Sequence, residues 1–314
     1  MSKEPILKVK DLGISFSQYT NGLVRRDLNV IRNLDIELYE GEILAVVGSS
    51  GSGKSLLAHA ILGILPDNAC TQGDIIYKGE ILDEKRKEKL RGDEIVLIPQ
   101  SVNYLDPLKK VGKQIKISIK DKDKKTQDEI VDNLFKKYNL DKKVKNYYPF
   151  QLSGGMARKV LLSTALASDS KVIIADEPTP GLDEESLNEV LKDFRDIADS
   201  GRAILMITHD IMAALKIADK VAIFYAGSTL EIANTSDFKQ KEVELRHPYT
   251  KALYKALPNH DFVPIDDKTQ PLPNELPKGC VFSDRCPLKD KNCENQAPKI
   301  REIRNGKVRC IHAT

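Results

Sequence analysis

One stretch of the sequence has the residue types and spacing needed to bind a phosphate group. Residues 48–55 fit the pattern G-x-x-x-x-G-K-[ST] and lie between an apolar run at residues 43–47 and a helical pattern at residues 54–65. Glycines allow backbone N–H groups to turn toward phosphate oxygens, and a helix start directs its positive dipole end at the same anion. The lysine can contact the β and γ phosphates, and the last serine offers a hydroxyl to Mg²⁺. The expected loop consists of Gly48, Ser49, Ser50, Gly51, Ser52, Gly53, Lys54 and Ser55.

Two adjacent acids form a second candidate group, because they end another apolar run. Asp176 and Glu177 follow residues 172–175 directly. Carboxylates at the end of a buried strand are unfavourable unless a cation or a reaction uses them. Successive strand residues point to opposite sides, so Asp176 can serve the Mg²⁺ shell while Glu177 polarises a water for in-line attack on the γ-phosphate. The pair predicts a nucleotide hydrolase, with two exposed acids at a strand end as the alternative.

Further polar residues stand at the ends of predicted elements. Residues 152–156 precede a helical pattern, so Ser153 and the following glycines form a second helix N-terminus that can bind an anion. Gln100 follows the apolar run at residues 95–98, and His209 follows residues 203–208. Asp183 comes just after the two acids and is placed to cap the next helix.

The elements that must position these residues are apolar strands alternating with helices. Short apolar runs at residues 43–47, 95–98, 172–175, 203–207 and 221–225 are typical of strands buried on both faces. Their alternation with helical patterns predicts an α/β fold with a parallel sheet. Alternating polarity at residues 6–12 and 34–38 predicts an added antiparallel layer. Residues from about 101 to 168 have helical spacing and are expected to form an inserted helical subdomain.

The five motifs, in this order along the chain, resemble those of the ATP-binding cassette (ABC) ATPases over about residues 5–245. The resemblance implies a P-loop NTPase fold of the ABC nucleotide-binding type that binds ATP and Mg²⁺. It also implies that two such domains face each other head to tail, with each ATP held between one phosphate loop and the signature residues of the opposing domain. The implied signature residues are Leu152, Ser153, Gly154, Gly155, Met156 and Asp183.

Family roles can be carried over to single positions of this chain. They place Phe16 under the adenine ring, Gln100 at the γ-phosphate and the permease contact, Glu177 as general base and His209 as γ-phosphate sensor. Tyr19 is a nearby competitor for the adenine contact, and simple packing is the alternative for either aromatic ring. The implied Mg²⁺ ligands are Ser55, Gln100 and Asp176.

Two features point to one branch of the family. Met156 replaces the glutamine that many cassette ATPases have after the signature glycines, as is common in oligopeptide, dipeptide and nickel importers. Residues 247–253, His-Pro-Tyr-Thr-Lys-Ala-Leu, resemble the segment that opens the C-terminal extension of that branch. The resemblance implies an ATP-hydrolysing subunit that energises import of oligopeptides or dipeptides, or alternatively of nickel, through a separate transmembrane permease. Its implied partners are a second and different ATPase subunit, two permease subunits and, indirectly, an extracytoplasmic solute-binding protein.

The C-terminal part of the chain differs in composition from the rest. Eight of the 15 prolines and four of the five cysteines fall between residues 248 and 314. We therefore expect an ATPase domain at residues 1–245 and an extension at residues 246–314, with a stiff, proline-broken connector. Four thiols in a short segment suggest a metal site, and the resemblance implies a 4Fe-4S cluster. Zinc, with His312 as a possible ligand, and free thiols are the alternatives. The four cysteines are Cys280, Cys286, Cys293 and Cys310.

Composition and charge exclude several classes of protein. The chain has 314 residues, of which 41% are hydrophobic, so disordered and fibrous classes are excluded. Its 49 basic and 46 acidic residues leave a net charge of +3, which gives no basis for a nucleic-acid partner. No apolar run is long enough to span a bilayer, and the N-terminus lacks an apolar signal core. We expect a peripheral protein at the cytoplasmic face of the cell membrane, with an ABC ATPase acting on DNA or ribosomes as a minor alternative.

Overall fold

Five parallel strands form the centre of the sheet in the computed structural model, which describes residues 4–20, 24–239, 244–257, 260–263, 265 and 268–313. Every residue of β3, β7 and β8 is buried, as expected for apolar runs covered on both faces. All five predicted strands are present, and none of their ends differs by more than one residue. Their order across the sheet is β9 (Lys220–Tyr225), β3 (Ile43–Val47), β8 (Ala203–Thr208), β7 (Val172–Asp176) and β6 (Ile95–Ile98).

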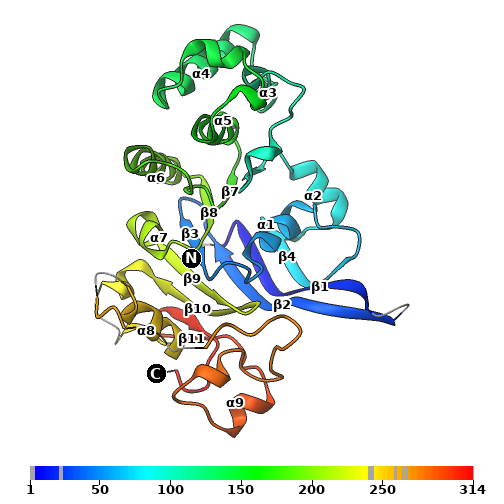
Figure 1. Ribbon diagram of the computed structural model, residues 1–314, viewed down its shortest axis with the longest axis vertical. Coiled ribbons are helices and arrows are strands. Elements are labelled where there is room, and N and C mark those ends of the chain that lie inside the picture. Colours follow the sequence, from blue (N-terminus) through cyan, green and yellow to red (C-terminus); the bar gives the residue numbers. More distant parts are fainter. Residues whose placement is uncertain are drawn as a thin grey trace.

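An antiparallel layer continues the sheet beyond β9, which confirms the predicted fold class. Strand β1 (Leu7–Thr20) pairs with both β2 (Val24–Leu38) and β4 (Ala69–Tyr77), and β5 (Glu80–Ile81) extends the edge. Strand β10 (Ser228–Asn234) joins this layer to the parallel strands through β9. In Figure 1 the β1–β2 pair projects beyond the body of the molecule.

The parallel strands separate two hydrophobic cores. In β3, Ile43, Ala45 and Val47 face a core that includes α5 (Gly154–Leu166), α6 (Glu184–Asp199) and α7 (Ile211–Ile217). Leu44 and Val46 face the opposite core, which includes α1 (Lys54–Leu62) and the antiparallel layer. The period of two along a strand therefore divides one apolar run between both cores.

Helix α1 ends before the residue that its apolar pattern predicts. The pattern extends to Leu65, but the helix stops at Leu62 because Gly63 adopts a left-handed conformation with φ of +63°. Its backbone N–H donates to the carbonyl of Ala60, which closes the last turn. Glycine at this position is a common helix stop because it has no Cβ to clash.

The predicted helical subdomain lies at the top of Figure 1. It contains η1 (Val102–Tyr104), α3 (Val111–Ile117), α4 (Lys124–Lys137), η2 (Lys142–Asn146), η3 (Pro149–Gln151) and α5, and it follows α2 (Glu84–Leu90) and β6. Val131 and Phe135 are the buried residues of α4, and Tyr138 follows at its end. The hydroxyl of Tyr138 donates to Asp193 of α6 at 2.5 Å, which ties the subdomain to the sheet domain.

The C-terminal extension continues the sheet. Its elements are α8 (Pro248–Lys255), η6 (Ser283–Arg285), α9 (Lys291–Asn295), β11 (Arg301–Ile303) and β12 (Gly306–Val308), which follow η4 (Thr235–Phe238). Strand β12 pairs antiparallel with β10, with Glu231 opposite Val308. Pro271, Pro273 and Pro277 lie outside helices and strands, as predicted, whereas Pro258 and Pro264 lie outside the described residues. The boundary at residue 246 stays a prediction.

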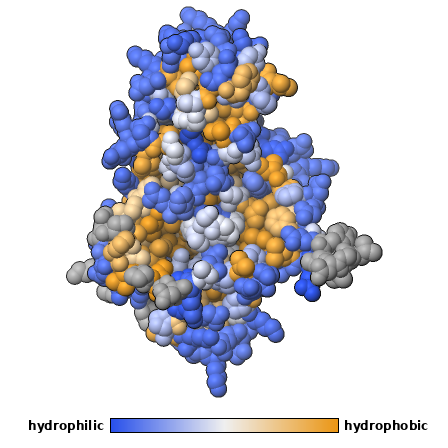
Figure 2. Space-filling view, in the orientation of Figure 1, coloured by the Kyte–Doolittle hydropathy of each residue, from blue (hydrophilic) through white to orange (hydrophobic). Residues whose placement is uncertain are grey.

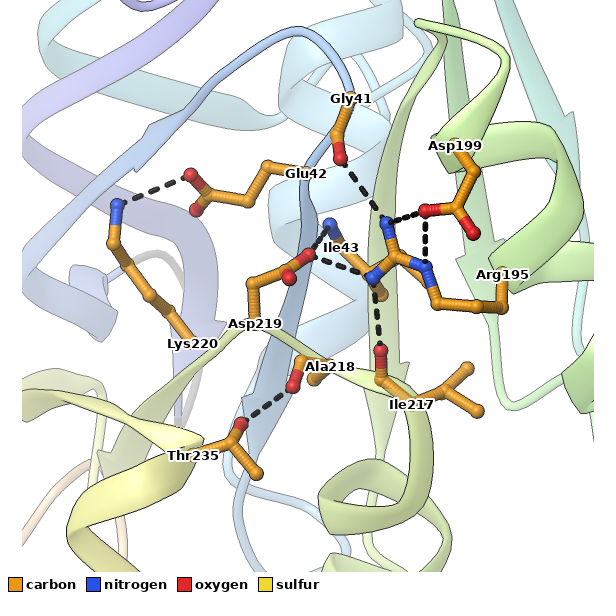
Figure 3. A network of polar contacts seen from close by, with 10 residues as sticks. All are labelled: Gly41, Glu42, Ile43, Arg195, Asp199, Ile217, Ala218, Asp219, Lys220 and Thr235. Atoms are coloured by element: carbon orange, nitrogen blue, oxygen red, sulfur yellow. Dashed lines mark hydrogen bonds and ion pairs between the residues drawn. The ribbon is translucent and has the colours of Figure 1, made fainter.

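A polar network fixes the ends of β3 and β9 that lie away from the predicted phosphate loop (Figure 3). The Arg195 guanidinium donates to Asp219 Oδ2 at 2.9 Å and to the Gly41 carbonyl at 3.1 Å. Asp219 Oδ2 also accepts from the backbone N–H of Ile43 at 2.8 Å. One side chain of α6 thereby holds the starts of two neighbouring parallel strands, so that the register of their other ends is set.

None of the helices in the described ranges combines the length and apolar character that a membrane span requires.

Candidate nucleotide-binding site

The predicted phosphate loop connects β3 to α1, and its backbone requires glycine at three positions. Gly51 and Gly53 have φ values of +76° and +94°, which other residues rarely adopt. A Cβ on Gly48 would lie 2.3 Å from the carbonyl oxygen of Phe224, so that only glycine fits against β9. Because the loop follows β3 directly, it lies at the carboxyl ends of the parallel strands, where α/β sheets bind ligands.

Lys54 lies over this loop with its side chain largely buried. Its Nζ donates to the carbonyl oxygens of Gly48 at 2.8 Å and Ser49 at 2.9 Å. Burial lowers the pKa of Lys54, and the nearby carboxylates of Glu177 and Asp176 act in the opposite direction. The ammonium group is thus held by the loop, with carboxylates nearby, in the place expected for a phosphate contact.

Asp176 ends β7 as a buried carboxylate. Burial, the largest effect, raises its pKa, whereas a hydrogen bond from Ser55 lowers it. Its Oδ1 atom is buried and has no hydrogen-bond partner among the described residues. A serine hydroxyl beside an unpartnered carboxylate oxygen is an oxygen donor set that suits Mg²⁺. The side chains present therefore fit a magnesium ion at this position.

Glu177 adopts a left-handed backbone conformation, with φ of +46°. Its side chain is 8% exposed, and both carboxylate oxygens lie 2.9 Å from Nδ1 of His209. Thr208 donates its hydroxyl to Glu177 Oε2 at 3.4 Å. Such a backbone conformation costs about 1–3 kcal/mol for a residue other than glycine and often marks a functional position. The structure thus brings Glu177 and His209 together at the carboxyl ends of β7 and β8.

Arg158 makes a contact near the site that was not predicted from the sequence. It lies in α5 directly after the signature residues, is buried, and donates from Nη1 to the carbonyl of Pro99 at 2.9 Å. Burial lowers its pKa, and the charges of Asp176 and Glu177 raise it. The Arg158 side chain thus links α5 to Pro99, the residue before Gln100. Gln100 itself is exposed. A charged residue within the buried face of a predicted helix was the available signal.

Signature residues 152–156 lie at the start of α5 and are exposed or half-buried. Ser153 caps the helix, since its Oγ accepts from the backbone N–H of Met156 at 3.3 Å. A Cβ added to Gly154 or Gly155 would meet no atom within 4 Å, so open space surrounds both glycines. Within the described ranges, no hydrogen bond links residues 152–156 to the phosphate loop. The structure therefore does not bring these two anion-binding groups together in one chain.

Two predicted residues have identifiable structural roles. Asp183 caps α6, because its carboxylate accepts from the backbone N–H of Ser186 at 2.8 Å and from the hydroxyl of Ser186 at 2.9 Å. Phe16 is half-buried in β1 and packs against the core on the α1 side of the sheet. The side chain of Tyr19 lies outside the described residues. The adenine contact of Phe16 stays a prediction.

None of the four C-terminal cysteines forms a disulfide bond. Cys280, Cys293 and Cys310 are buried and Cys286 is half-buried. Burial, followed by weaker effects of the other thiols, raises the pKa of Cys280 to about 11. The ligand atoms of Asp290, Cys293 and His312 lie within 4.8 Å of one another. This group, the one that meets that distance among the described residues, contains one of the four cysteines.

Comparisons with known proteins agree with this architecture. The family model for ABC transporters matches residues 31–180, and the model for the oligopeptide/dipeptide transporter C-terminal region matches residues 230–293. A dimeric bacterial ABC transporter cassette, MJ0796, has a TM-score of 0.64 and 22% identity, covering 73% of this chain and 98% of that one. A likeness at this identity supports the fold alone.

Relatives with higher identity extend over nearly the whole chain. The oligopeptide transport ATP-binding protein OppD of Escherichia coli (strain K12) is 35% identical, covering 98% of this chain and 92% of the relative. The probable D,D-dipeptide transport ATP-binding protein DdpD of the same organism is 33% identical, covering 98% and 96%. The dipeptide transport ATP-binding protein DppD of Bacillus subtilis (strain 168) is 33% identical, covering 94% and 90%. The chain therefore belongs to the family of ABC transporter ATP-binding proteins.

Proposed function

We propose that this ABC ATPase hydrolyses ATP to drive import of oligopeptides or dipeptides through a separate membrane permease. The observation that carries the hydrolytic part is the contact of Glu177 with His209 beside the phosphate loop, at 2.9 Å. The choice of peptide rests on the relatives that are named for peptide transport and on the match of residues 230–293 to the peptide-transporter C-terminal region. These similarities favour peptides over nickel.

Chain residues supply each part of the proposed hydrolysis. The loop of residues 48–55 and the Lys54 ammonium bind the β and γ phosphates, while Gln100 contacts the γ-phosphate. Ser55, Asp176 and Gln100 would hold Mg²⁺, which neutralises phosphate charge when bound. The Glu177 carboxylate accepts the proton of the attacking water, and His209 orients that carboxylate and senses the γ-phosphate.

The active unit in this proposal is a pair of cassettes. Each ATP lies between the phosphate loop of one cassette and the signature residues of the other. The open space around Gly154 and Gly155 supports this arrangement, since a phosphate from an opposing chain can approach them without obstruction. The opposing cassette is a second ATPase subunit, in our proposal a different chain.

Exposed apolar side chains on the helical subdomain offer a surface for the permease. Leu108 is 86% exposed and Phe150 76%, and Tyr104 and Ile117 are also exposed. Figure 2 shows hydrophobic surface among the polar residues in this upper part of the molecule. In the proposal, two permease subunits dock here at the cytoplasmic face of the cell membrane, and a solute-binding protein delivers the peptide from the other side.

We further propose that the four cysteines hold a 4Fe-4S cluster with a structural role. Four thiolates are the usual ligands of such a cluster, and a short segment with little core of its own gains stability from it. Protein purified without oxygen should contain stoichiometric iron and sulfide. Stoichiometric zinc would instead favour a zinc site that includes His312, and absence of any metal would leave free thiols.

Purification from native membranes tests the proposed transport function. A tagged chain is extracted in mild detergent, and its partners are identified by mass spectrometry. Two permease subunits, a second cassette ATPase and a peptide-binding solute-binding protein are the expected result. A nickel-binding protein in their place would overturn the substrate, and recovery with ribosomal or DNA-bound proteins would overturn the transport role while leaving the ATPase intact.

A further inference from the structure

Gln270 lies in the proline-containing connector, of which the structure describes residues 268–277, and its side chain contacts the phosphate loop. The Oε1 atom of Gln270 accepts a hydrogen bond from the hydroxyl of Ser49 at 2.7 Å and from the backbone N–H of Ala226 at 3.3 Å. Ala226 follows β9, whose Phe224 carbonyl lies against Gly48. One amide oxygen therefore contacts both the phosphate loop and the strand end that supports it.

Ser49 is in turn bound to the residues that shape the loop. Its carbonyl oxygen accepts from Lys54 Nζ at 2.9 Å and from the hydroxyl of Ser52 at 2.8 Å. A change in the orientation of Ser49 would move an acceptor that positions the Lys54 ammonium. A chain of hydrogen bonds thus runs from Gln270 through Ser49 to Lys54.

The connector that carries Gln270 is held on both sides of this residue. Before it, Lys268 Nζ donates to the carbonyl of Asp284 at 2.9 Å. After it, the carbonyl of Pro277 accepts from Arg32 Nη1 at 2.7 Å. Next to it, Arg285 of η6 donates to the hydroxyl of Tyr225 in β9 at 3.1 Å. These contacts attach the connector to the cysteine-bearing segment and to the nucleotide domain at once, so the position of Gln270 depends on both.

We propose that Gln270 is a positioning residue for nucleotide binding, which fixes the Ser49 end of the phosphate loop and thereby the Lys54 ammonium. The inference rests on the proposed role of this loop in binding ATP. It predicts that the loop is partly ordered before nucleotide arrives, so that less ordering is required on binding. Without Gln270, the first half of the loop would exchange its backbone hydrogens faster and bind phosphates less tightly.

A double-mutant cycle tests the coupling between the two side chains. The full chain is prepared as wild type, Gln270→Ala, Ser49→Ala and the double variant, and Thr269→Ala serves as an adjacent exposed control. MgADP dissociation constants are measured by calorimetry, and hydrogen exchange at residues 48–55 is measured in nucleotide-free protein. A lost hydrogen bond of ordinary strength should weaken binding about two- to tenfold. We expect each single variant and the double variant to show the same loss, and Thr269→Ala to show none.

Wild-type MgADP binding by Gln270→Ala would overturn the proposal, and so would losses in the single variants that multiply in the double variant. Gln270→Glu provides a test that does not depend on nucleotide, since its carboxylate can still accept from Ser49 and Ala226. Loop exchange in this variant should match wild type, and exchange as fast as in Gln270→Ala would contradict the mechanism. Lys54→Ala distinguishes failure of the proposed phosphate loop from failure of the positioning role of Gln270. Unchanged nucleotide binding in that variant would refute the proposed phosphate loop itself, whereas lost binding there with none lost in Gln270→Ala would refute only the positioning role.

Discussion

At the scale of single residues, substitution of Glu177 tests the proposed ATP hydrolysis most directly. Glu177→Gln keeps the shape of the side chain but cannot accept a proton from water. Because general-base catalysis contributes about 10²- to 10⁴-fold, ATP turnover should fall by about 100-fold or more while ATP still binds. Phosphate release and nucleotide dissociation constants measure the two effects separately. ATPase activity at the wild-type level would rule out Glu177 as the base.

Motif spacing predicted the places of Lys54, Ser55 and Asp176, because a strand, a tight loop and a helix leave few alternatives for the residues between them. It did not predict the left-handed backbone of Glu177, which depends on contacts with the neighbouring strand that are distant in sequence. Gln270 lies 221 positions beyond Ser49, so no local pattern could relate them. The sequence therefore did not predict hydrogen bonds between the phosphate-binding motifs and residues far away along the chain, such as that between Ser49 and Gln270.

At the scale of elements, burial explains which boundaries could be predicted. The apolar runs of the parallel strands are covered on both faces, so their ends coincide with changes in polarity. The antiparallel strands were predicted at residues 6–12 and 34–38, but β1 and β2 extend to Thr20 and back to Val24. Beyond Ile14 the side chains of β1 with described burial are half-buried or exposed, so hydrophobic alternation fades although backbone pairing continues.

A buried ion pair joins β10 to the start of α8. Arg246 Nη1 lies 3.1 Å from Glu231 Oε1, and both side chains are fully buried. Arg246→Met would leave the Glu231 carboxylate without its charged partner, and the free energy of unfolding should fall by about 3–5 kcal/mol. Urea denaturation measures this loss. Adding Glu231→Gln to the same chain should recover part of it, and a double variant no more stable than Arg246→Met would contradict the charge-based explanation.

His247 makes the stability of the extension depend on pH. Its Nδ1 caps α8 by accepting from the backbone N–H of Tyr249 at 3.0 Å, and burial lowers its pKa from 6.5 to about 3. The unfolded chain therefore takes up this proton at higher pH than the folded chain. The stabilisation is fully present above pH 6.5 and is lost as pH falls toward 3, by at most about 1.4 kcal/mol per pH unit.

Substitution of His247 isolates this effect from other titrations. His247→Asn keeps a side-chain oxygen to cap α8 but cannot be protonated in this range. Urea midpoints measured between about pH 7 and pH 5 should fall for the wild type and fall less for the variant. The stabilising contacts of Glu37, whose pKa is lowered to about 2, are lost only as pH falls below about 4.5, so they contribute little in this window. Parallel pH dependence in both proteins would show that His247 does not titrate as proposed.

At the scale of the whole molecule, the composition change near residue 246 indicated a separate unit, but the chain beyond it is bound into the nucleotide domain. Arg309 donates to the Thr229 carbonyl at 3.2 Å and to Asp35 Oδ2 at 2.5 Å. Lys307 forms an ion pair with Glu37 at 2.6 Å. Composition can locate such a segment, but pairing of β12 with β10 depends on shape and register far along the chain.

Removing the last two strands would test whether the extension is energetically independent. Truncation after Lys299 removes Arg309, which leaves Asp35 without its ion-pair partner, and uncovers the edge of β10. We expect wild type to unfold in a single calorimetric transition, and the truncated chain to unfold at a lower temperature throughout its nucleotide domain. Arg309→Lys in the full chain keeps the charge but cannot make all three guanidinium contacts, which are those to Thr229, to Asp35 and to the Pro298 carbonyl at 2.9 Å. Its midpoint should therefore lie between those two. A truncated chain with the wild-type midpoint would show instead that the extension folds as a separate domain, as the composition alone suggests.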